Sequence, residues 1–179
     1  FTLPHFEAND LEVAFDQIEL FGFPLISPFR LLTPEAQAVA ERGVRSEALP
    51  DCIGRTIEVV GYLVTVKETH TAQRERMSFG CFVDVEGQWL DTIHFPPSLK
   101  QFAFRGRGIY LVRGVVKEEF GCIHVEAAFM QKLDYIPDPR YAEDGLPGRE
   151  PRANNASAAR RRQTMGARSG GGLLKRALR

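Results

Sequence analysis

The fold is decided by the run Gly54-Arg55-Thr56-Ile57-Glu58-Val59-Val60-Gly61-Tyr62-Leu63-Val64-Thr65-Val66-Lys67 and by the residues that follow it as far as Tyr135. Across this stretch, apolar and polar residues alternate in short runs that Gly, Pro and charged residues interrupt. Alternation with a period of two is typical of strands that bury one face, and several short strands in succession indicate a barrel or a sandwich. The sequence therefore predicts a mainly β domain.

The interruptions also predict where each strand ends. After the first strand, 55–67, a polar loop should run from 68 to 76, with Gly61 providing the bend that a long first strand needs. The further elements are expected at 77–86 (second strand), 88–95 (third strand), 98–104 (short crossover helix), 109–119 (fourth strand) and 122–135 (fifth strand). A five-stranded Greek-key barrel of this kind is the OB fold, which often holds single-stranded nucleic acid.

The residues before the barrel predict two helices. The first follows a cap at Asn9 or Asp10 and ends at Gly22, and the second spans residues 34–42 with Gly43 in a left-handed C-terminal position. The stretch between the helices is too rich in Pro for regular structure and too apolar to be solvated. We expect it to lie across a neighbouring surface, either the barrel or a domain outside this chain.

The formal net charge of zero hides an uneven distribution. Residues 1–53 contain nine acids and three bases, residues 54–135 contain ten of each, and residues 141–179 contain three acids and nine bases. The basic end cannot bury enough apolar surface to offset its ordering entropy, so we predict a disordered tail that either attracts phosphates or is merely solvated. The expected parts are a lead-in segment at 1–53, a barrel at 54–136 and a tail at 137–179.

Composition excludes several functional classes. The chain is 44% hydrophobic and 26% charged, and its longest apolar runs fall far short of the ~20 residues that span a bilayer. Three widely spaced cysteines and four histidines without ligand spacing predict no metal and no cofactor. We expect a cytoplasmic protein with reduced, half-buried thiols. Because the chain begins at Phe1 and not at Met, we interpret it as a piece of a longer protein.

Six motifs in a fixed order resemble one protein family. They are Ile18-Glu19-Leu20-Phe21-Gly22-Phe23-Pro24, Val60-Gly61-Tyr62-Leu63-Val64-Thr65, Met77-Ser78-Phe79-Gly80, Asp91-Thr92-Ile93-His94-Phe95-Pro96, Arg105-Gly106-Arg107-Gly108 and Pro137-Asp138-Pro139-Arg140. Together they resemble the C-terminal part of the bacterial replicative DNA polymerase III alpha subunit. The resemblance implies a non-catalytic OB domain, since the palm carboxylates that hold two metal ions for nucleotidyl transfer have no counterpart here. It implies as partners single-stranded DNA, the remaining domains of the polymerase and other replisome subunits.

If the barrel binds single-stranded DNA, aromatic side chains on the second and third strands should stack on the bases. Phe79 is the first candidate, with a core position as the alternative, because alternation places Phe79 and Phe82 on opposite faces. Trp89, the only tryptophan, could stack or pack in the core. His94 could contact DNA or be a partly buried polar residue.

Cations beside these aromatics would bind the phosphates. The candidates are Arg55, Lys67, Arg74, Arg76, Arg105, Arg107 and Arg113. Arg74 and Arg76 are the best of them, since the first loop flanks the ligand in this fold. The even charge of the barrel indicates weak affinity in isolation, which tethering to a polymerase that already holds the duplex would offset.

The paired acids of the barrel do not predict catalysis. Asp84 with Glu86, and Glu118 with Glu119, lack a His, Lys or third acid at metal spacing. We expect solvated surface carboxylates.

The run Gln17-Ile18-Glu19-Leu20-Phe21 resembles the short peptide by which bacterial replication proteins dock on the sliding clamp. However, Ile18 and Phe21 fall on the apolar face of the predicted helix. We expect them to be buried in packing.

The residues and the resemblance together predict a nucleic-acid-binding OB module of a replicative DNA polymerase that contacts single-stranded template DNA. A protein-interaction domain within the replisome is the main alternative. A tRNA anticodon-binding barrel is a further one, which the preceding Gly-Phe-Pro segment disfavours.

Overall fold

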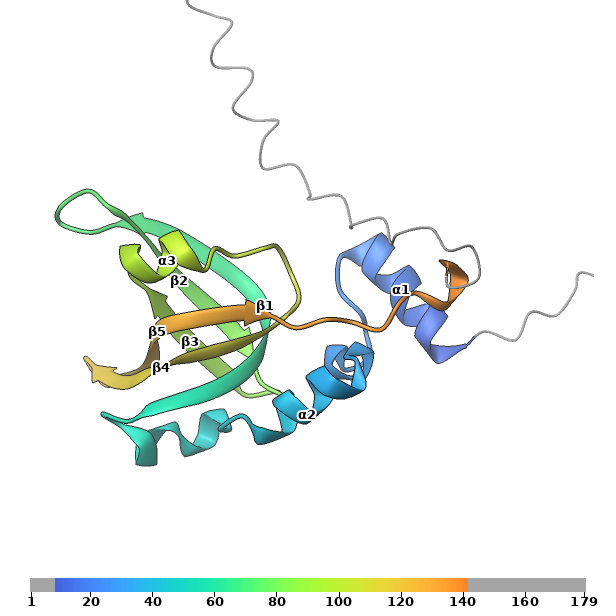
Figure 1. The fold of residues 1–179 in the computed structure, drawn as a ribbon, viewed down its shortest axis with the longest axis horizontal. Helices are drawn as coiled ribbons and strands as arrows, with labels where there is room; N and C mark the ends of the chain where they lie inside the picture. The colour runs from blue at the N-terminus through green and yellow to red at the C-terminus, as the bar shows by residue number, and fades with distance from the viewer. Residues whose placement is uncertain (1–8, 142–179) are drawn as a thin grey trace, which may run out of the picture. The chain divides into compact units, whose positions relative to one another are not determined.

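The computed structural model describes residues 9–141, and its centre is a closed barrel of five strands (Figure 1). The strands are β1 (Thr56–His70), β2 (Arg76–Val83), β3 (Trp89–His94), β4 (Ile109–Glu119) and β5 (Cys122–Lys132). Their order around the barrel is β1-β2-β3-β5-β4, and every neighbouring pair is antiparallel except β3 with β5. The predicted mainly β fold, a Greek-key OB barrel with flanking helices, is confirmed.

Alternation along the strands fills the barrel with apolar side chains. Phe82 is fully buried, and its ring lies 6.4 Å from that of Phe104 and 6.1 Å from that of Tyr110, centroid to centroid. Phe79, three residues earlier, is 40% exposed. The expectation that one of the two phenylalanines points inward is confirmed, and burial of a side chain as large as Phe82 contributes about 2–3 kcal/mol.

Gly61 is needed for space and not for the predicted bend. The irregularity in the pairing of β1 with β2 lies between Leu63 and Thr65, beyond the glycine. A Cβ atom at position 61 would lie 2.8 Å from the Cβ of Phe82, closer than real Cβ contacts. The glycine therefore lets the largest core ring approach β1.

The lead-in segment packs on the outside of the barrel only after its first helix, which lies beside residues 139–141 (Figure 1). It contains α1 (Asp10–Phe21), η1 (Pro28–Leu31), α2 (Pro34–Arg42) and η2 (Ser46–Cys52), the η elements being 3-10 helices. The side chains of Asn9 and Thr33 accept backbone N–H groups at the starts of α1 and α2. Phe29 and Leu32 are buried with Val60 of β1 in a second apolar cluster. The Pro-rich stretch was expected to lie either across the barrel or across a domain outside this chain, and in the structure it lies across the barrel.

Gly43 does not adopt the predicted left-handed conformation. Its φ and ψ are −61° and 142°, so the chain leaves α2 in an extended conformation. The reason is tertiary: the next residue, Val44, donates its N–H to the carbonyl of Glu58 on β1 at 2.8 Å. By contrast, Gly22 after α1 is left-handed with φ 80°, as its position at the helix end predicts.

Several predicted boundaries shift for identifiable reasons. The β1–β2 loop shrinks to residues 71–75, because both strands extend past the barrel as a hairpin. The helix α3 (Pro96–Gln101) begins two residues early, since the fixed φ of proline suits the first helical position. β5 ends at Lys132, and the chain then pairs with the lead-in segment through a bridge between Leu32 and Tyr135, before η3 (Pro139–Tyr141). Of the predicted tail, 137–179, residues 142–179 lie outside the described residues.

The expected burial of the clamp-like motif is wrong for Phe21. Ile18 is half-buried, but Phe21 is 57% exposed and its ring lies at the surface 6.4 Å from that of Phe23. Of the residues of α1, only Ala14 is fully buried. The helix thus lies on its neighbours through a narrow face that does not reach its last residue.

Candidate nucleic-acid interface

The outward side chains of β2 and β3 form one continuous surface. Partner residues in adjacent strands point to the same side of a sheet. The pairs Phe79–Ile93, Cys81–Asp91 and Val83–Trp89 therefore lie side by side, and Lys67 of β1 and Glu126 of β5 flank the first of them. We call this surface the β2–β3 face; its members are Lys67, Phe79, Cys81, Val83, Trp89, Asp91, Ile93 and Glu126.

Two aromatic side chains project from this face. Trp89 is 64% exposed and Phe79 is 40% exposed, which decides both sequence-level alternatives in favour of the surface. Their rows are four residues apart along β2, a distance of about 13 Å in an extended strand. Two unstacked bases therefore have room to lie on the two rings.

The charge of the face does not itself favour nucleic acid. Lys67 is its one cation, against the carboxylates of Asp91 and Glu126. Burial, reinforced by a hydrogen bond and the charge of Asp91, raises the pKa of Cys81 to about 11, so this thiol stays neutral. Stacking, and not charge, must therefore supply most of the affinity at the centre of the face.

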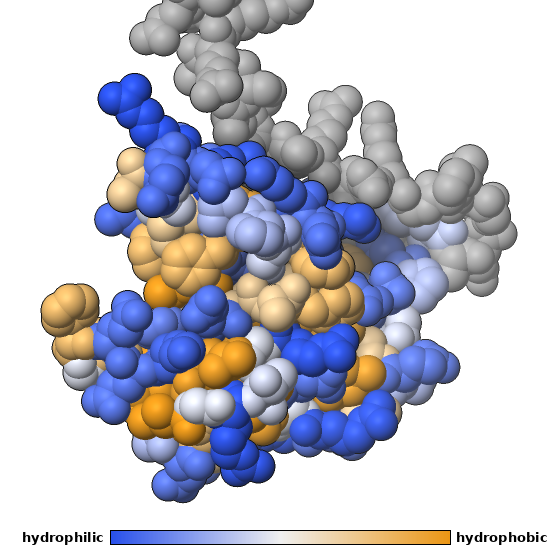
Figure 2. Space-filling view, turned by 60° about the vertical axis from the view of Figure 1, so that its left-hand side comes forward, coloured by the Kyte–Doolittle hydropathy of each residue, from blue (hydrophilic) through white to orange (hydrophobic). Residues whose placement is uncertain are grey.

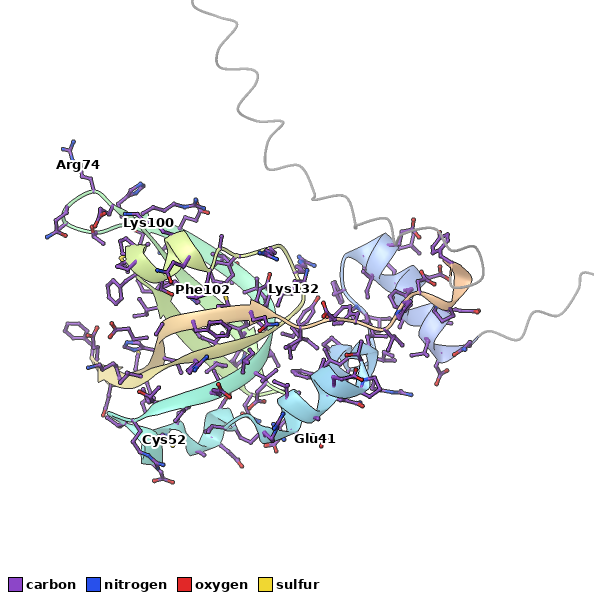
Figure 3. All side chains as sticks on the ribbon, in the orientation of Figure 1. Glu41, Cys52, Arg74, Lys100, Phe102 and Lys132 are labelled. Carbon is purple, nitrogen blue, oxygen red and sulfur yellow. The ribbon has the colours of Figure 1, made fainter. Side chains whose placement is uncertain are left out.

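The two preferred cations lie on the β1–β2 hairpin but do not face the same way. Arg74 is at the outermost point of the loop, directed away from the barrel (Figure 3). Arg76 pairs with His70 on the side of the hairpin opposite Phe79, and its guanidinium forms an ion pair with Glu68. Within the described residues Arg74 forms no ion pair, whereas Arg76 is paired with Glu68.

The other predicted cations are distributed around the barrel. Arg113 lies on the β1–β4 side, 3.5 Å from Glu58 and 4.9 Å above the ring of Phe129, so it is not part of the face. Arg55 is exposed immediately before β1, and Arg105 is exposed in the loop before β4. Neither is brought to the β2–β3 face: the carbonyl of Arg55 accepts the N–H of Val116 on β4, and the carbonyl of Arg105 accepts from Lys132 on β5.

Arg107 is in the same loop as Arg105 but lies against the lead-in segment. Its guanidinium donates to the carbonyl of Gly22 at 3.1 Å. It also lies close enough to Tyr62 to act against the effect of burial, which raises the pKa of that phenol. Tyr62 is the β1 partner of Val83, so Arg107 sits beyond the end of the face opposite Lys67.

His94 is a correction to the predicted site. It is fully buried inside the barrel, where its Nε2 lies 2.8 Å from the hydroxyl of Thr92 and its ring packs edge-on against Phe104 at 4.7 Å. The last residue of β3 points inward because residues 90, 92 and 94 share the interior side of the strand. It cannot contact a ligand on the β2–β3 face.

Asp84 is also not the solvated carboxylate that the sequence predicts. It is 3% exposed and accepts the backbone N–H groups of Ser46, Glu86 and Gln88 at 2.9–3.0 Å. Burial acts to raise its pKa, but these three hydrogen bonds outweigh burial and hold the pKa below its ordinary value. The carboxylate ties the β2–β3 turn to η2 and has no proton to give or take in chemistry near neutral pH.

Phe120 is an exposed aromatic residue that is not among the predicted site residues. Phe120 forms the β4–β5 turn with Gly121, has a φ of 53° and is completely exposed. The sequence signal for its exposure is a Phe-Gly pair at a two-residue hairpin turn, where Asn-Gly is usual.

On the face of the molecule turned forward in Figure 2, apolar side chains gather in patches that hydrophilic side chains separate.

Within residues 9–141, no three His, Cys, Asp or Glu side chains are grouped closely enough to hold a metal ion. Among the helices of the same residues, none has both the length and the apolar character to cross a membrane.

Comparison with known proteins finds similarity only among solved structures. No family model matches the sequence, and no curated protein does. The chain is similar to the OBody AM1L10 bound to hen egg-white lysozyme (14% identity over 53% of this chain and 94% of that one, TM-score 0.42). It is similar to the mitochondrial single-stranded DNA binding protein Rim1 of S. cerevisiae (14% identity over 45% of this chain and 96% of that one, TM-score 0.37). It is also similar to the second OB-fold domain of replication protein A from Methanococcus maripaludis (13% identity over 47% of this chain and 89% of that one, TM-score 0.35). At these identities and scores the matches give no information on what this chain binds.

Proposed function

We propose that the β2–β3 face binds single-stranded DNA, and that it does so as the OB domain of a polymerase like the bacterial DNA polymerase III alpha subunit. One observation carries the proposal: Phe79 and Trp89 project from the same face of adjacent strands of an OB barrel, in rows four residues apart, with room for a base on each. The six-motif resemblance supports the polymerase context. In that context the domain acts in the cytoplasm and contacts the template strand during replication.

The binding mode follows from the composition of the face. Bases stack on Phe79 and Trp89, and each stack contributes about 1–3 kcal/mol whatever the base. Lys67 and Arg74 contact phosphates at one end, while Glu126 in the row of Lys67 and Asp91 in the middle row lower the affinity. The intrinsic affinity is therefore weak, and the tethered domain gains from the high effective concentration that the polymerase provides.

Replacing Phe79 with Ala is expected to weaken binding of oligo(dT) about 5- to 100-fold, because one stacking partner is lost. The measurement is fluorescence anisotropy of a labelled oligo(dT) at low and moderate salt, with quenching of Trp89, the only tryptophan, as a second signal from the face. Phe21→Ala is the matched control, since it removes an exposed ring that lies on α1, away from the face.

If the Phe79→Ala and Phe21→Ala variants bind oligo(dT) with equal affinity, the proposal is wrong. In that case binding would come from the basic C-terminal residues, which both variants retain. Such binding would show a steep dependence on salt without quenching of Trp89.

We propose no catalysis for this chain itself, although the parent enzyme that it resembles is a DNA-directed DNA polymerase. The proposal is supported by the state of Asp84, whose carboxylate is occupied by three backbone N–H groups. A nucleotidyl-transfer assay on this chain is expected to give no product.

A second candidate function is docking onto a neighbouring domain of the same polymerase. It is favoured by four apolar side chains that stay exposed around the end of α1, namely Leu20 (76%), Phe21 (57%), Phe23 (43%) and Leu25 (69%). In a longer chain with the upstream polymerase domains, the amides of residues 20–25 should exchange hydrogen more slowly than in this chain. Unchanged exchange there would exclude docking through this segment.

A further inference from the structure

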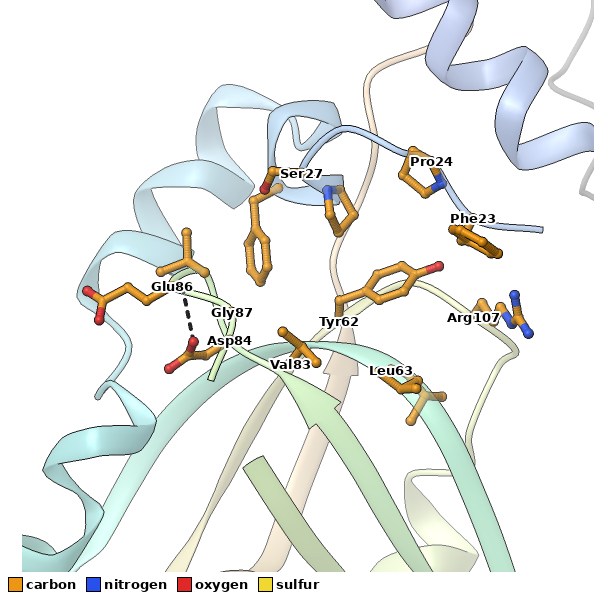
Figure 4. A pocket seen from close by; sticks show the side chains of 14 residues that line it. Phe23, Pro24, Ser27, Tyr62, Leu63, Val83, Asp84, Glu86, Gly87 and Arg107 are labelled. Atoms are coloured by element: carbon orange, nitrogen blue, oxygen red, sulfur yellow. Dashed lines mark hydrogen bonds between the residues drawn. The ribbon is translucent and has the colours of Figure 1, made fainter. Parts of the chain in front are cut away.

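The lead-in segment and the barrel enclose a pocket of about 660 Å³ at the end of the β2–β3 face that is remote from Lys67 (Figure 4). Phe23, Pro24 and Phe29 form one wall, and Tyr62 and Val83 of the barrel form the other. The barrel alone would leave this place open, so the pocket exists because the Gly-Phe-Pro segment crosses β1. Pockets of this size and apolar character are the usual form of small-ligand sites.

The polar groups of the pocket are few and differ at its two ends. In Figure 4 the phenol of Tyr62 extends toward Phe23 and Arg107. The guanidinium of Arg107 donates to the carbonyl of Gly22, and the residue is exposed. The open end of the pocket therefore combines an aromatic ring with a cation.

The two acids at the other end of the pocket already have partners. Asp84 accepts three backbone N–H groups, and the carboxylate of Glu86 lies 3.4 Å from the guanidinium of Arg45. Arg107 forms no ion pair within the described residues. The positive charge of the pocket lining is thus that of Arg107 at the open end, away from the two carboxylates, and an anionic group is favoured at that end.

The pocket continues the β2–β3 face without a break. Tyr62, Val83 and Trp89 are partners in one row across β1, β2 and β3, and the first two line the pocket while Trp89 projects from the face. A strand whose bases stack on Phe79 and Trp89 reaches the pocket with its next nucleotide. An apolar peptide would fit the walls equally well but would gain nothing from Arg107.

We propose that this pocket takes one unstacked nucleotide of the bound strand, with its base between Phe23 and Tyr62 and its phosphate on Arg107. The inference rests on the proposed function and assigns the strand a fixed end point that an isolated OB barrel lacks. It also gives Arg107 a role as a phosphate ligand distinct from the cations of the β1–β2 hairpin.

The test consists of two titrations. In the first, thymidine 5′-monophosphate is added to the full ¹⁵N-labelled chain and binding is monitored by NMR. In the second, the unlabelled chain is added to labelled oligo(dT) and binding is monitored by fluorescence anisotropy. The nucleotide should shift the amides of pocket residues such as Tyr62, Val85 and Gly87. Thymidine without phosphate should bind at least about tenfold more weakly, as expected for the loss of a charge-assisted hydrogen bond. Arg107→Gln should reduce nucleotide affinity by a similar factor, and Phe23→Ala about fivefold or more.

The chain offers a matched control for each variant. Arg42→Gln also removes an exposed arginine that bonds one backbone carbonyl, that of Ala38 at 3.0 Å, and Phe21→Ala removes an exposed ring two residues from Phe23. Both should bind as the wild type does. A thermal melt of each variant separates a loss of contact from a release of the lead-in segment.

The outcomes distinguish the two proposals. If Phe79→Ala weakens oligo(dT) binding while Arg107→Gln and Phe23→Ala do not, the pocket assignment is wrong and the binding face remains. If none of the three weakens it, both proposals fail. Equal binding of thymidine and its monophosphate also overturns the pocket assignment, because it is the result expected of a purely apolar site for a peptide side chain.

Discussion

Gly114→Ala is expected to destabilise the protein by at least about 3 kcal/mol, near the upper end of what overpacking costs. Gly114 is on β4 at the point where its pairing with β5 shifts register. An added Cβ would overlap the carbonyl oxygen of Glu126 and lie 2.8 Å from its carbon and 2.9 Å from Cγ1 of Val125. The main obstacle is backbone in a closed barrel, so no side-chain rotation can relieve it.

The measurement is urea unfolding of the wild type and of the variant, with thermal melting as a second observable. For a domain of this size we expect the melting temperature to fall by about 10 °C or more. Gly87→Ala is the control, because a Cβ at that position meets nothing within 4 Å, so the variant is destabilised only by the strain of a positive φ of 83°. That cost is about 1–2 kcal/mol, so a Gly114→Ala variant no less stable than Gly87→Ala contradicts the packing argument.

The elements that the sequence predicts correctly are those with local causes. Period-two alternation makes the five strands visible, and capping chemistry makes both helices visible, since Asn9 and Thr33 need only their own next turn to act. Gly43 shows the limit of this reasoning. Its conformation is decided by the hydrogen bond of Val44 to Glu58, which no local pattern contains.

The candidate site was only partly predictable, because alternation gives two faces without saying which is inside. Phe79 and Trp89 could be proposed but not oriented until β2 and β3 were paired. The predicted cations were less reliable still, since Arg76 and Arg113 form ion pairs with Glu68 and Glu58 across paired strands, and alternation alone does not give the strand pairing. The pocket was not predictable at all, because it forms between the lead-in segment and barrel strands that are distant in sequence.

Lowering the pH from 7 to 4 is expected to cost the protein about 3 kcal/mol of stability through His94 alone. Burial lowers the pKa of His94 from 6.5 to about 4. The hydroxyl of Thr92 donates to the carbonyl of Gly80 at 3.2 Å, so it accepts from Nε2–H of His94 and fixes the neutral tautomer. The buried Nδ1 has no hydrogen-bond partner and would carry the added proton in an apolar place beside Phe104.

The direction of the effect follows from proton binding. Below pH 6.5 the unfolded chain protonates His94, whereas the folded chain does not until about pH 4. The unfolded state thus binds more protons in this window, and the free energy of unfolding falls by about 1.4 kcal/mol per pH unit as the pH is lowered. Stability from this group is complete above pH 6.5 and is lost by pH 4.

His94→Leu removes the titration while keeping a side chain of similar bulk, and Thr92 can still donate to Gly80. Urea unfolding at pH 7.5, 6, 5 and 4 should therefore show a flatter pH dependence in the variant, with the difference confined to the range from 6.5 to 4. Asp84 loses its stabilising charge only below its lowered pKa, and it does so in both proteins. Parallel curves for the two proteins would mean that the barrel interior admits water to His94 and that its pKa is close to the ordinary value.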